Sequence, residues 1–252
     1  KLDKDWAKLM AKAKETGLVI DCCENEQLRT LLPVMYEELE RCQKALDGYL
    51  EQKRGKFPRF YFVSNPVLLQ ILSQGSDPMA IQPYYQTVFD AIVQVIHDET
   101  DKRKIHTMVS RFKGTAEEIP FSSVVNAVGN IEDWLATMKV EQQYTMKEIC
   151  RRCAEDIEAG VGVDGLRSFV DNMPPQYALL GIQLMWTMDV TEALDNCRVK
   201  KSGVADCTRK QTQIISELSS WCLESLPNRM VRTKYETLVT IQVHQRDVMS
   251  VI

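Results

Sequence analysis

The chain has 252 residues, 44% of them hydrophobic, so it is long enough to bury a sizeable core without disulfides or metals. Its 35 acidic and 31 basic side chains give a net charge of −4, which excludes the concentrated basic face that binds a phosphate backbone. No apolar run reaches the roughly 20 residues that span a bilayer. We therefore expect a soluble protein that binds neither nucleic acid nor membrane.

The two ends and the cysteines indicate the setting of the chain. It starts with Lys1 rather than Met, and no apolar signal segment follows. At the other end, the helical pattern of residues 248–252 continues to the last residue without a stop signal. We therefore expect a fragment of a much longer chain. Eight cysteines without a secretory signal indicate reduced thiols in a cytosolic-type compartment.

The first long predicted helix carries a heptad seam of apolar residues that alternate four and three positions apart. They are Leu28, Leu32, Met35, Leu39, Cys42, Leu46 and Tyr49. Pro33 is expected to kink or restart this helix near its beginning. The seam can pair two chains in a coiled coil, but it is short, so a helix that docks on its neighbours within a bundle is favoured.

An aromatic segment follows, with the sequence Phe57-Pro58-Arg59-Phe60-Tyr61-Phe62. Four aromatic side chains in six residues are not expected to stay in water, so they should pack and fix the angle between two helices. Asn65 is expected to cap the second of these helices, and Pro66 suits its first turn. We refer to residues 57–65 as the aromatic joint.

Between residues 94 and 121 the apolar residues fall in short runs, separated by charged or Gly-containing turns at 97–104 and 113–117. This pattern predicts a small antiparallel sheet of two or three short strands. Residues 60–63 are a candidate for an additional strand of that sheet.

Helical periodicity resumes after Gly129, with Asn130 as a candidate cap. The apolar stripe of this helix consists of Ile131, Leu135, Met138, Tyr144 or Thr145, Ile149 and Cys153. The next helix, after Pro174 and Pro175, is apolar nearly all round over 178–188, so we expect other helices to enclose it at the centre of the domain.

Two further helices are predicted towards the end of the chain. The first is amphipathic, has its apolar residues between Ile214 and Leu226, and is stopped by Pro227. Val239, Ile241 and Val243 alternate with polar residues as in a strand, and period alone narrowly favours a strand there. The length of the segment and the lack of turn residues over 230–252 favour a helix instead.

The fold expected from these elements is mainly α: an elongated multi-helix bundle with one small antiparallel β-sheet around residues 94–121. We divide it into three parts. Residues 1–92 form an N-terminal helical subdomain that contains the aromatic joint, residues 93–122 form a small β insertion, and residues 123–252 form a C-terminal helical bundle.

Two motifs suggest chemistry, but their context argues against it. Residues 160–165 match the dinucleotide fingerprint, yet a helix precedes them where a strand is required, so an interhelical loop is favoured. Cys150 and Cys153 form a single Cys-x-x-Cys on a predicted helix, and a zinc site needs two such pairs, so buried thiols are favoured. No phosphate-binding loop is present. We expect no catalytic residue, metal or cofactor in this chain.

Several stretches together resemble the dynein heavy chain, in the linker region that precedes the AAA+ motor ring. The matching stretches, in order, are 3–10, 42–46, 49–54, 57–62, 68–73, 129–135, 183–187 and 243–248. The aromatic segment is the most specific of them, and the final stretch looks more like axonemal than cytoplasmic dyneins. Residues 111–117 depart from the family pattern because they form a longer turn.

This resemblance implies a stiff, mostly helical lever that arches over a ring of ATPase modules and converts ring rearrangement into movement along microtubules. Its compliant points would be residues 75–78 and 159–165. The structural candidates are Phe57, Pro58, Arg59, Phe60, Tyr61, Phe62, Trp134, Gln183 and Trp186.

The resemblance also implies partners and a location. The partners would be the AAA+ ring of the same heavy chain and other dynein subunits. Microtubules would be contacted only through other parts of the parent chain, which would also hold ATP and Mg²⁺. The location would be the cytoplasm and cytoskeleton, in the axoneme of a cilium or flagellum.

Two other functions compete with the lever. The first is a free-standing helical scaffold or adaptor that dimerises through the 28–49 seam. The second, ranked third, is a redox or metal enzyme that uses Cys150 and Cys153.

Overall fold

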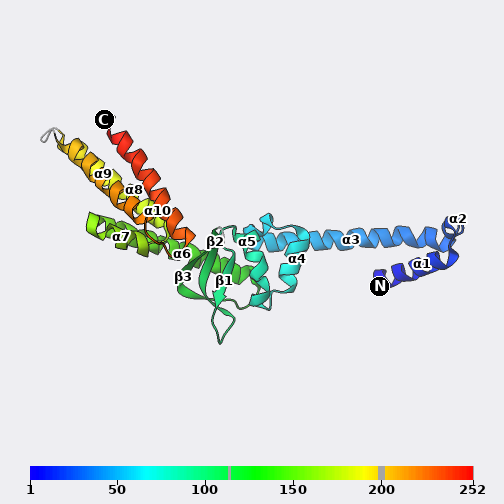
Figure 1. The fold of residues 1–252 in the computed structure, drawn as a ribbon. Helices are drawn as coiled ribbons and strands as arrows, with labels where there is room; N and C mark the ends of the chain where they lie inside the picture. The colour runs from blue at the N-terminus through cyan, green and yellow to red at the C-terminus, as the bar shows by residue number, and fades with distance from the viewer. Residues whose placement is uncertain (113–114, 198–201, 252) are drawn as a thin grey trace. The chain divides into compact units, whose positions relative to one another are not determined.

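A computed structural model describes residues 1–112, 115–197 and 202–251. Over these residues the chain forms ten α-helices, two short 3₁₀ helices and one three-stranded sheet (Figure 1). The prediction of a mainly α fold with one small antiparallel sheet is confirmed.

The chain divides into two compact units, Lys1–Gln70 and Ile71–Ile252. The boundary lies within helix α4, Asn65–Ser73. The three-part division at 92/93 and 122/123 addresses smaller subdomains and stays a prediction.

Unit 1 is built from α1 (Leu2–Thr16), α2 (Val19–Cys23), α3 (Glu26–Lys56) and the 3₁₀ helix η1 (Pro58–Phe62). The side chain of Asn25 caps α3 by accepting from the Gln27 amide at 3.1 Å. The expected restart at Pro33 is wrong, because α3 continues through it. Pro33 has no backbone N–H, so the Arg29 carbonyl loses its hydrogen bond within the helix. Arg29 is exposed, so water can donate to this carbonyl instead.

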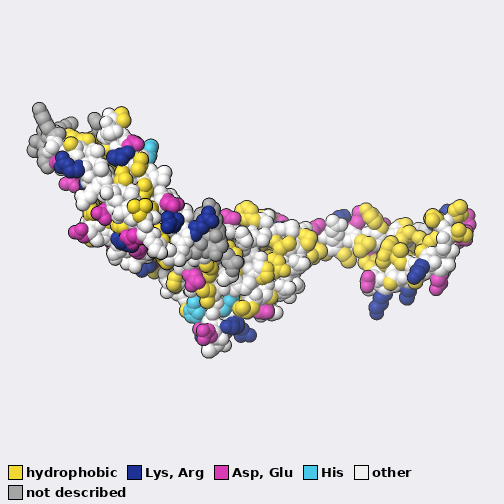
Figure 2. All heavy atoms as spheres, viewed as in Figure 1, with side chains coloured by type: hydrophobic (Ala, Val, Ile, Leu, Met, Phe, Trp, Pro, Cys, Tyr) yellow, Lys and Arg dark blue, Asp and Glu magenta, His cyan; other side chains and the backbone are white. Residues whose placement is uncertain are grey.

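The heptad seam of α3 is largely open to solvent. Met35 is buried and Leu28 is half-buried, whereas the other five seam residues are exposed. Figure 2 shows hydrophobic side chains gathered over α1, α2 and the adjoining part of α3. The described residues therefore do not cover this seam.

The sheet of unit 2 contains β1 (Gln94–His97), β2 (Lys104–Phe112) and β3 (Thr115–Asn126), in the order β1-β2-β3 with antiparallel pairing. The strands extend further than expected, because much of the predicted turn at 113–117 belongs to β3; Lys113 and Gly114 lie outside the described residues. Helix α6 (Ile131–Glu158) packs against β3, where the Ser122 amide donates to Thr145 Oγ1 at 2.9 Å.

The expected strand at 60–63 is wrong. These residues belong to η1 and its end, where the Phe60 amide donates to the Phe57 carbonyl and the Val63 amide to the Phe60 carbonyl, at 3.0 and 3.1 Å. Pro58 explains this outcome, because its fixed φ suits the first position of a helix and it offers no donor to a ladder.

The remaining elements of unit 2 are η2 (Pro78–Tyr84), α5 (Tyr85–Phe89), α7 (Val163–Asn172), α8 (Pro175–Asn196), α9 (Gly203–Cys222) and α10 (Arg229–Met249). The choice of helix for the last segment is confirmed by α10. The main core joins α6 to α10 around Ile149, Leu166, Ile182, Leu218 and Leu238.

The stripe predicted for α6 is confirmed, and it resolves one alternative. Thr145 is buried, whereas Tyr144 is 50% exposed. Asn130 stands at the cap position, but its amide donates to the Asp133 carboxylate instead of capping the helix.

Neither of the two expected compliant points, 75–78 and 159–165, is an unpacked linker over its whole length. Only residues 159–162 form a loop between α6 and α7, because α7 begins at Val163. At the other point, a Cβ added to Gly75 would lie 3.3 Å from the Ile131 Cβ, so this turn is packed against α6.

Helix α8 approaches its neighbours most closely at Gly181. A Cβ at this position would lie 2.4 Å from Cζ of Phe169 on α7 and 3.0 Å from Sγ of Cys153 on α6. Only glycine leaves room for this packing. Helix α8 is not enclosed by the described residues as expected, because Leu180, Met188 and Leu194 are 43–45% exposed.

Replacing Gly181 with alanine is expected to lower the free energy of unfolding by about 1–3 kcal/mol, because the added methyl group overpacks the core. Gly165→Ala is the control, since its nearest neighbour would be Val161 Cγ1 at 4.0 Å. That change should raise stability by up to about 1 kcal/mol through helix propensity. Thermal or denaturant unfolding measures both. Equal effects of the two substitutions would contradict the close approach at Gly181.

Candidate functional site

The aromatic joint of unit 1 is anchored by two of its four aromatic side chains. Phe57 and Phe60 are 1% and 0% exposed, and their rings meet edge to face with centroids 5.0 Å apart. Tyr61 and Phe62 are 55% and 75% exposed, so the expectation that all four would pack is wrong. Edge-to-face pairs add stability beyond area burial. The Phe57–Phe60 pair therefore forms the hydrophobic part of the joint.

Arg54, in the last turn of α3, forms the polar part of the joint. Its Nη2 donates to the Val63 carbonyl at 3.1 Å and to Asn65 Oδ1 at 2.6 Å, and its Nε donates to the Phe60 carbonyl at 3.4 Å. A planar guanidinium suits such divergent acceptors better than a lysine does. Arg54 thereby ties the end of α3 to the end of η1 and the start of α4.

Other residues of the joint have smaller roles. Pro58 begins η1, and Arg59 is half-buried within it. The Tyr61 hydroxyl donates to Glu51 Oε1 at 2.5 Å, and this hydrogen bond raises the pKa of Tyr61. Asn65, the expected cap of α4, is already the first residue of that helix, and its side-chain oxygen accepts from Arg54.

The other three candidates, Trp134, Gln183 and Trp186, belong to unit 2. Trp134 is 2% exposed near the start of α6 and is a core residue. Gln183 and Trp186 lie on α8 and line a groove of about 380 Å³ beside α10. The sequence candidates therefore occupy three separate places.

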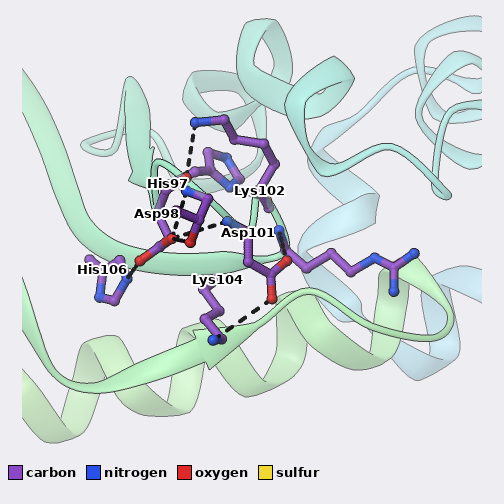
Figure 3. Close-up of polar contacts among 8 residues, drawn as sticks. His97, Asp98, Asp101, Lys102, Lys104 and His106 are labelled. Carbon is purple, nitrogen blue, oxygen red and sulfur yellow. Dashed lines mark hydrogen bonds and ion pairs between the residues drawn. The ribbon is translucent and has the colours of Figure 1, made fainter.

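A polar cluster closes the loop between β1 and β2 (Figure 3). Asp98 Oδ1 accepts from the Thr100 hydroxyl at 2.6 Å and from the Thr100 and Asp101 amides at 2.8 and 3.0 Å. Its other oxygen lies 3.1 Å from His106 Nε2. These bonds hold the pKa of Asp98 well below its usual range, the Thr100 hydroxyl contributing most.

A hydrogen bond from His97 also closes this loop. Its Nδ1 lies 2.6 Å from the Lys102 carbonyl, and burial lowers its pKa. Within the ranges that the structure describes, no group of three or more His, Cys, Asp or Glu side chains is placed to hold a metal ion. These hydrogen bonds close the loop between β1 and β2.

A set of long-range contacts, which we call the α7 clamp, holds α7 to α9 and α10. Arg167 on α7 makes a two-pronged ion pair with Glu224, at 2.8 and 2.6 Å. Lys234 on α10 donates to the Val170 and Met173 carbonyls at 2.6 and 3.3 Å, at the end of α7. The cation thus serves the carbonyls left unpaired there.

The clamp also perturbs its own ionisable groups. Lys234 is buried, and desolvation lowers its pKa. Burial and the hydrogen bond from the Tyr235 hydroxyl to Asp171 raise the pKa of Tyr235 to about 12. In both groups burial is the main cause of the shift.

The sequence motifs that suggested chemistry have structural roles. Cys150 and Cys153 are free thiols on α6, and Cys153 donates to the Tyr177 carbonyl at 3.3 Å. Burial raises the pKa of Cys153, which disfavours the reactive thiolate. Residues 160–162 belong to the expected interhelical loop, whereas residues 163–165 form the first turn of α7.

Sequence analysis missed Arg54 and the α7 clamp. For Arg54 the available signal was its place as a basic residue in the last turn of a helix, just before a Pro-containing segment. The clamp joins Lys234 to a carbonyl 64 positions away, and no local pattern marks such a contact. Within the described ranges, none of the helices is both long and apolar enough to cross a membrane.

Comparison with known proteins gives one consistent family. Residues 1–153 match the family model "Dynein heavy chain, N-terminal region 2". The chain is 41% identical over 250 residues to dynein axonemal heavy chain 5 of Rattus norvegicus, which covers 98% of this chain and 7% of that protein. It is also 41% identical over 249 residues to dynein axonemal heavy chain 8 of Homo sapiens, covering 98% of this chain and 5% of that protein.

A more distant relative comes from an alga. The chain is 35% identical over 248 residues to the dynein gamma chain of the flagellar outer arm of Chlamydomonas reinhardtii, covering 98% of this chain and 5% of that protein. The chain thus spans about 5–7% of the length of these relatives.

Phe60→Ala is expected to lower the free energy of unfolding by about 3–5 kcal/mol, because it empties a fully buried site. Phe62→Ala removes the same number of atoms from a side chain that is 75% exposed. Its effect should stay within about 0.5 kcal/mol. Denaturant unfolding compares the two variants. An unchanged midpoint for Phe60→Ala would contradict the anchoring role of this side chain.

Asp98 is expected to make the β1–β2 loop sensitive to acid. Because its folded pKa is lowered, its contribution is complete above the ordinary Asp pKa of about 3.9 and is lost as the pH falls below that value. The protection of the Thr100 and Asp101 amides, taken relative to their intrinsic exchange rates at each pH, should therefore fall in acid. Asp98→Asn should accelerate the same amides already at neutral pH. Equal protection in both proteins at neutral pH would contradict the role of the carboxylate.

Proposed function

Because the chain belongs to the dynein heavy chain family, we propose that it is the linker, or lever, of an axonemal dynein motor. In this role it couples ATP-driven rearrangement of the motor ring to movement along microtubules. The names of its relatives, which include axonemal and flagellar outer-arm chains, support an axonemal setting. The proposed location is the cytoskeleton of a cilium or flagellum.

In this proposal the chain contributes mechanics and the rest of the heavy chain contributes chemistry. ATP and Mg²⁺ bind elsewhere in the parent protein, whose AAA+ ring is the first partner of the lever. Other dynein subunits are further partners, and microtubules are contacted through other parts of the heavy chain. The sequence of residues 1–252 supports this division, since it contains no phosphate-binding loop.

The observation that carries the proposal is the way α3 ends. This helix has 31 residues, which correspond to about 45 Å at 1.5 Å per residue. Arg54 and the Phe57–Phe60 pair fasten its last turn to η1 and the start of α4. A long helix transmits force only if its end cannot swivel, and these contacts supply that restraint.

Unit 2 supports the same role by internal stiffness. The α7 clamp combines a two-pronged ion pair with a buried lysine that bonds two carbonyls. Such contacts tie helices distant in sequence into one body. A free-standing adaptor that dimerises through the 28–49 seam is not favoured, since the relatives are heavy chains many times longer than this chain.

Weakening the aromatic joint in the complete motor is expected to uncouple movement from ATP turnover. In a heavy chain carrying Arg54→Ala and Phe60→Ala, microtubule gliding should slow several-fold, while ATP turnover without microtubules stays close to that of the unmodified motor. The physical reason is that a swivelling helix end dissipates the displacement without touching the nucleotide sites.

Phe62→Ala is the matched control and should leave both quantities unchanged, because this side chain is exposed. Gliding assays and a steady-state ATPase assay give the two measurements. Unchanged gliding in the double variant, or a parallel loss of ATP turnover, would overturn the lever proposal.

A further inference from the structure

Helix α8 has two apolar faces, and the described residues cover only one. Ala178, Ile182 and Met185 face the core. The residues of the opposite face recur three or four positions apart along the helix. They are the exposed residues Leu180, Thr187, Thr191 and Leu194, together with Leu184, which is half-buried and also packs against the core. Leu180 is 45% exposed and Leu194 is 43% exposed. A helix of this kind is normally packed on both sides.

The outer face of α8 carries few side-chain polar groups that still need a hydrogen-bond partner. No charged residue occurs between Gln176 and Met188. The hydroxyls of Thr187 and Thr191 donate to carbonyls one turn earlier, Gln183 and Thr187, each at 2.8 Å. Their methyl groups remain as the available surface. This face therefore suits contact with another apolar surface better than contact with water.

Beside this face, α8 and α10 form the groove of about 380 Å³ already described. Its lining contains no Asp, Glu, Lys or Arg; it consists of Gln183, Trp186, Thr240, Ile241, His244, Gln245 and Val248. The hydrophobic residues of these helices lie between charged ones on the visible face of Figure 2. The chemistry of the groove is therefore neutral and largely apolar.

Two polar atoms in the groove lining are buried without a partner among the described residues. They are the donor Nε1 of Trp186 and the acceptor Oε1 of Gln245, whose residue is only 7% exposed. Buried polar groups in proteins are nearly always hydrogen-bonded. A donor and an acceptor left unpaired in the same groove indicate that a polar group from another segment is missing.

The directions of the three helices show what kind of segment fits. The Trp221 and Tyr235 rings lie 5.6 Å apart, and Cys207 shares a cluster with Met249, so α9 and α10 run antiparallel. Lys210 binds Asp189 at 2.7 Å, and Cys207 packs with Val190 and Ala193, so α8 and α9 also run antiparallel. One more helix beside α8 and α10 would complete an up-down-up-down bundle.

We propose that the groove between α8 and α10 receives a further α-helix of the same heavy chain, from a part outside residues 1–252. The relatives are many times longer than this chain, so such a segment is available on the same polypeptide at high effective concentration. Its contact face is apolar and uncharged, with one side-chain amide or hydroxyl that accepts from Trp186 and donates to Gln245. This inference rests on the family and on the fold of unit 2, and it is independent of the lever.

Photo-cross-linking in the complete heavy chain tests the proposal. A benzoylphenylalanine replaces Thr240, which is exposed in the groove, or Ser220, which is exposed on α9 as a control. We expect the probe at 240 to join a helical peptide of the same chain outside residues 1–252, with a yield that does not change on dilution. The probe at 220 should not join that peptide.

Three results would overturn the proposal: a cross-link to a second copy whose yield falls on dilution, a cross-link to another subunit, or no cross-link at 240. None of them bears on the gliding test of the lever, so the two proposals fail separately.

A pair of charge substitutions makes the test independent of the probe. Leu180→Glu places a carboxylate on the outer face of α8 and should lower the cross-linking yield at 240 by about tenfold, equivalent to about 1.4 kcal/mol of binding. Leu223→Glu places the same charge on a side chain that is 89% exposed, and should leave the yield unchanged. In residues 1–252 alone, neither substitution should shift the melting temperature by much. Equal yields for the two variants would contradict the proposed site.

Discussion

The packing of unit 2 depends on Gly181, the glycine at which α7 and α6 come closest to α8. At Gly181 the Phe169 ring of α7 fills the space that a Cβ would occupy. Because α7 lies this close to α8, the end of α7 comes within reach of α10, where Lys234 bonds the Val170 and Met173 carbonyls. One missing methyl group thus sets the distance on which the α7 clamp depends.

The same constraint explains why α8 keeps a second apolar face. The helices α6, α7, α9 and α10 all contact α8, whose buried residues include Gly181 and Ile182. Helices are about 10 Å wide, so those already in place cannot also cover the opposite side. The apolar residues from Leu180 to Leu194 therefore need a cover that the described residues do not provide.

Unit 1 reaches stiffness by a different route. Its long helix α3 has only Met35 and Leu50 buried, so a surrounding core does not hold it in place. Order at its end comes from the buried Phe57–Phe60 pair and from Arg54, which serves acceptors on η1 and α4 with one side chain. A guanidinium network is short-ranged and directional, in contrast to the broad hydrophobic contacts of unit 2.

The sequence predicted the elements that depend on neighbouring residues, and it missed the contacts between residues far apart in the chain. The stripe of α6 and the length of the last segment were sufficient to place α6 and α10, because periodicity reports one buried face. Residues 60–63 were a candidate for an additional strand, whereas Pro58 favours a helical turn there. The α7 clamp could not be predicted, since it pairs residues that only the finished fold brings together.

The candidate site shows the same division. The aromatic composition located the joint at 57–65, but composition alone could not tell the buried Phe60 from the exposed Phe62, because that depends on the direction of each side chain in η1. Arg54 was visible in the sequence, yet its role follows from carbonyls of residues six and nine positions later. Gln183 and Trp186 were marked by resemblance, and only the structure placed them together in a groove.

A polar layer interrupts the bundle of α8, α9 and α10 between its two hydrophobic clusters. The antiparallel register places Gln211 of α9 level with Gln245 of α10, and Gln211 also bonds Asp189 of α8 at 3.3 Å. Gln242 is fully buried, and neither atom of its amide has a partner among the described residues.

Unpaired buried amides lower the stability of the structure around them. Beyond this layer the bundle is held by the small cluster of Val190, Ala193, Cys207 and Met249. Local stability follows the number of buried apolar contacts, so the bundle is stiffest at the α7 clamp and weakens towards this cluster. A helix bound beside Trp186 and Gln245 would contact the bundle at the level of the polar layer. The proposed helix would therefore add contacts to a part of the bundle that has few buried apolar contacts of its own.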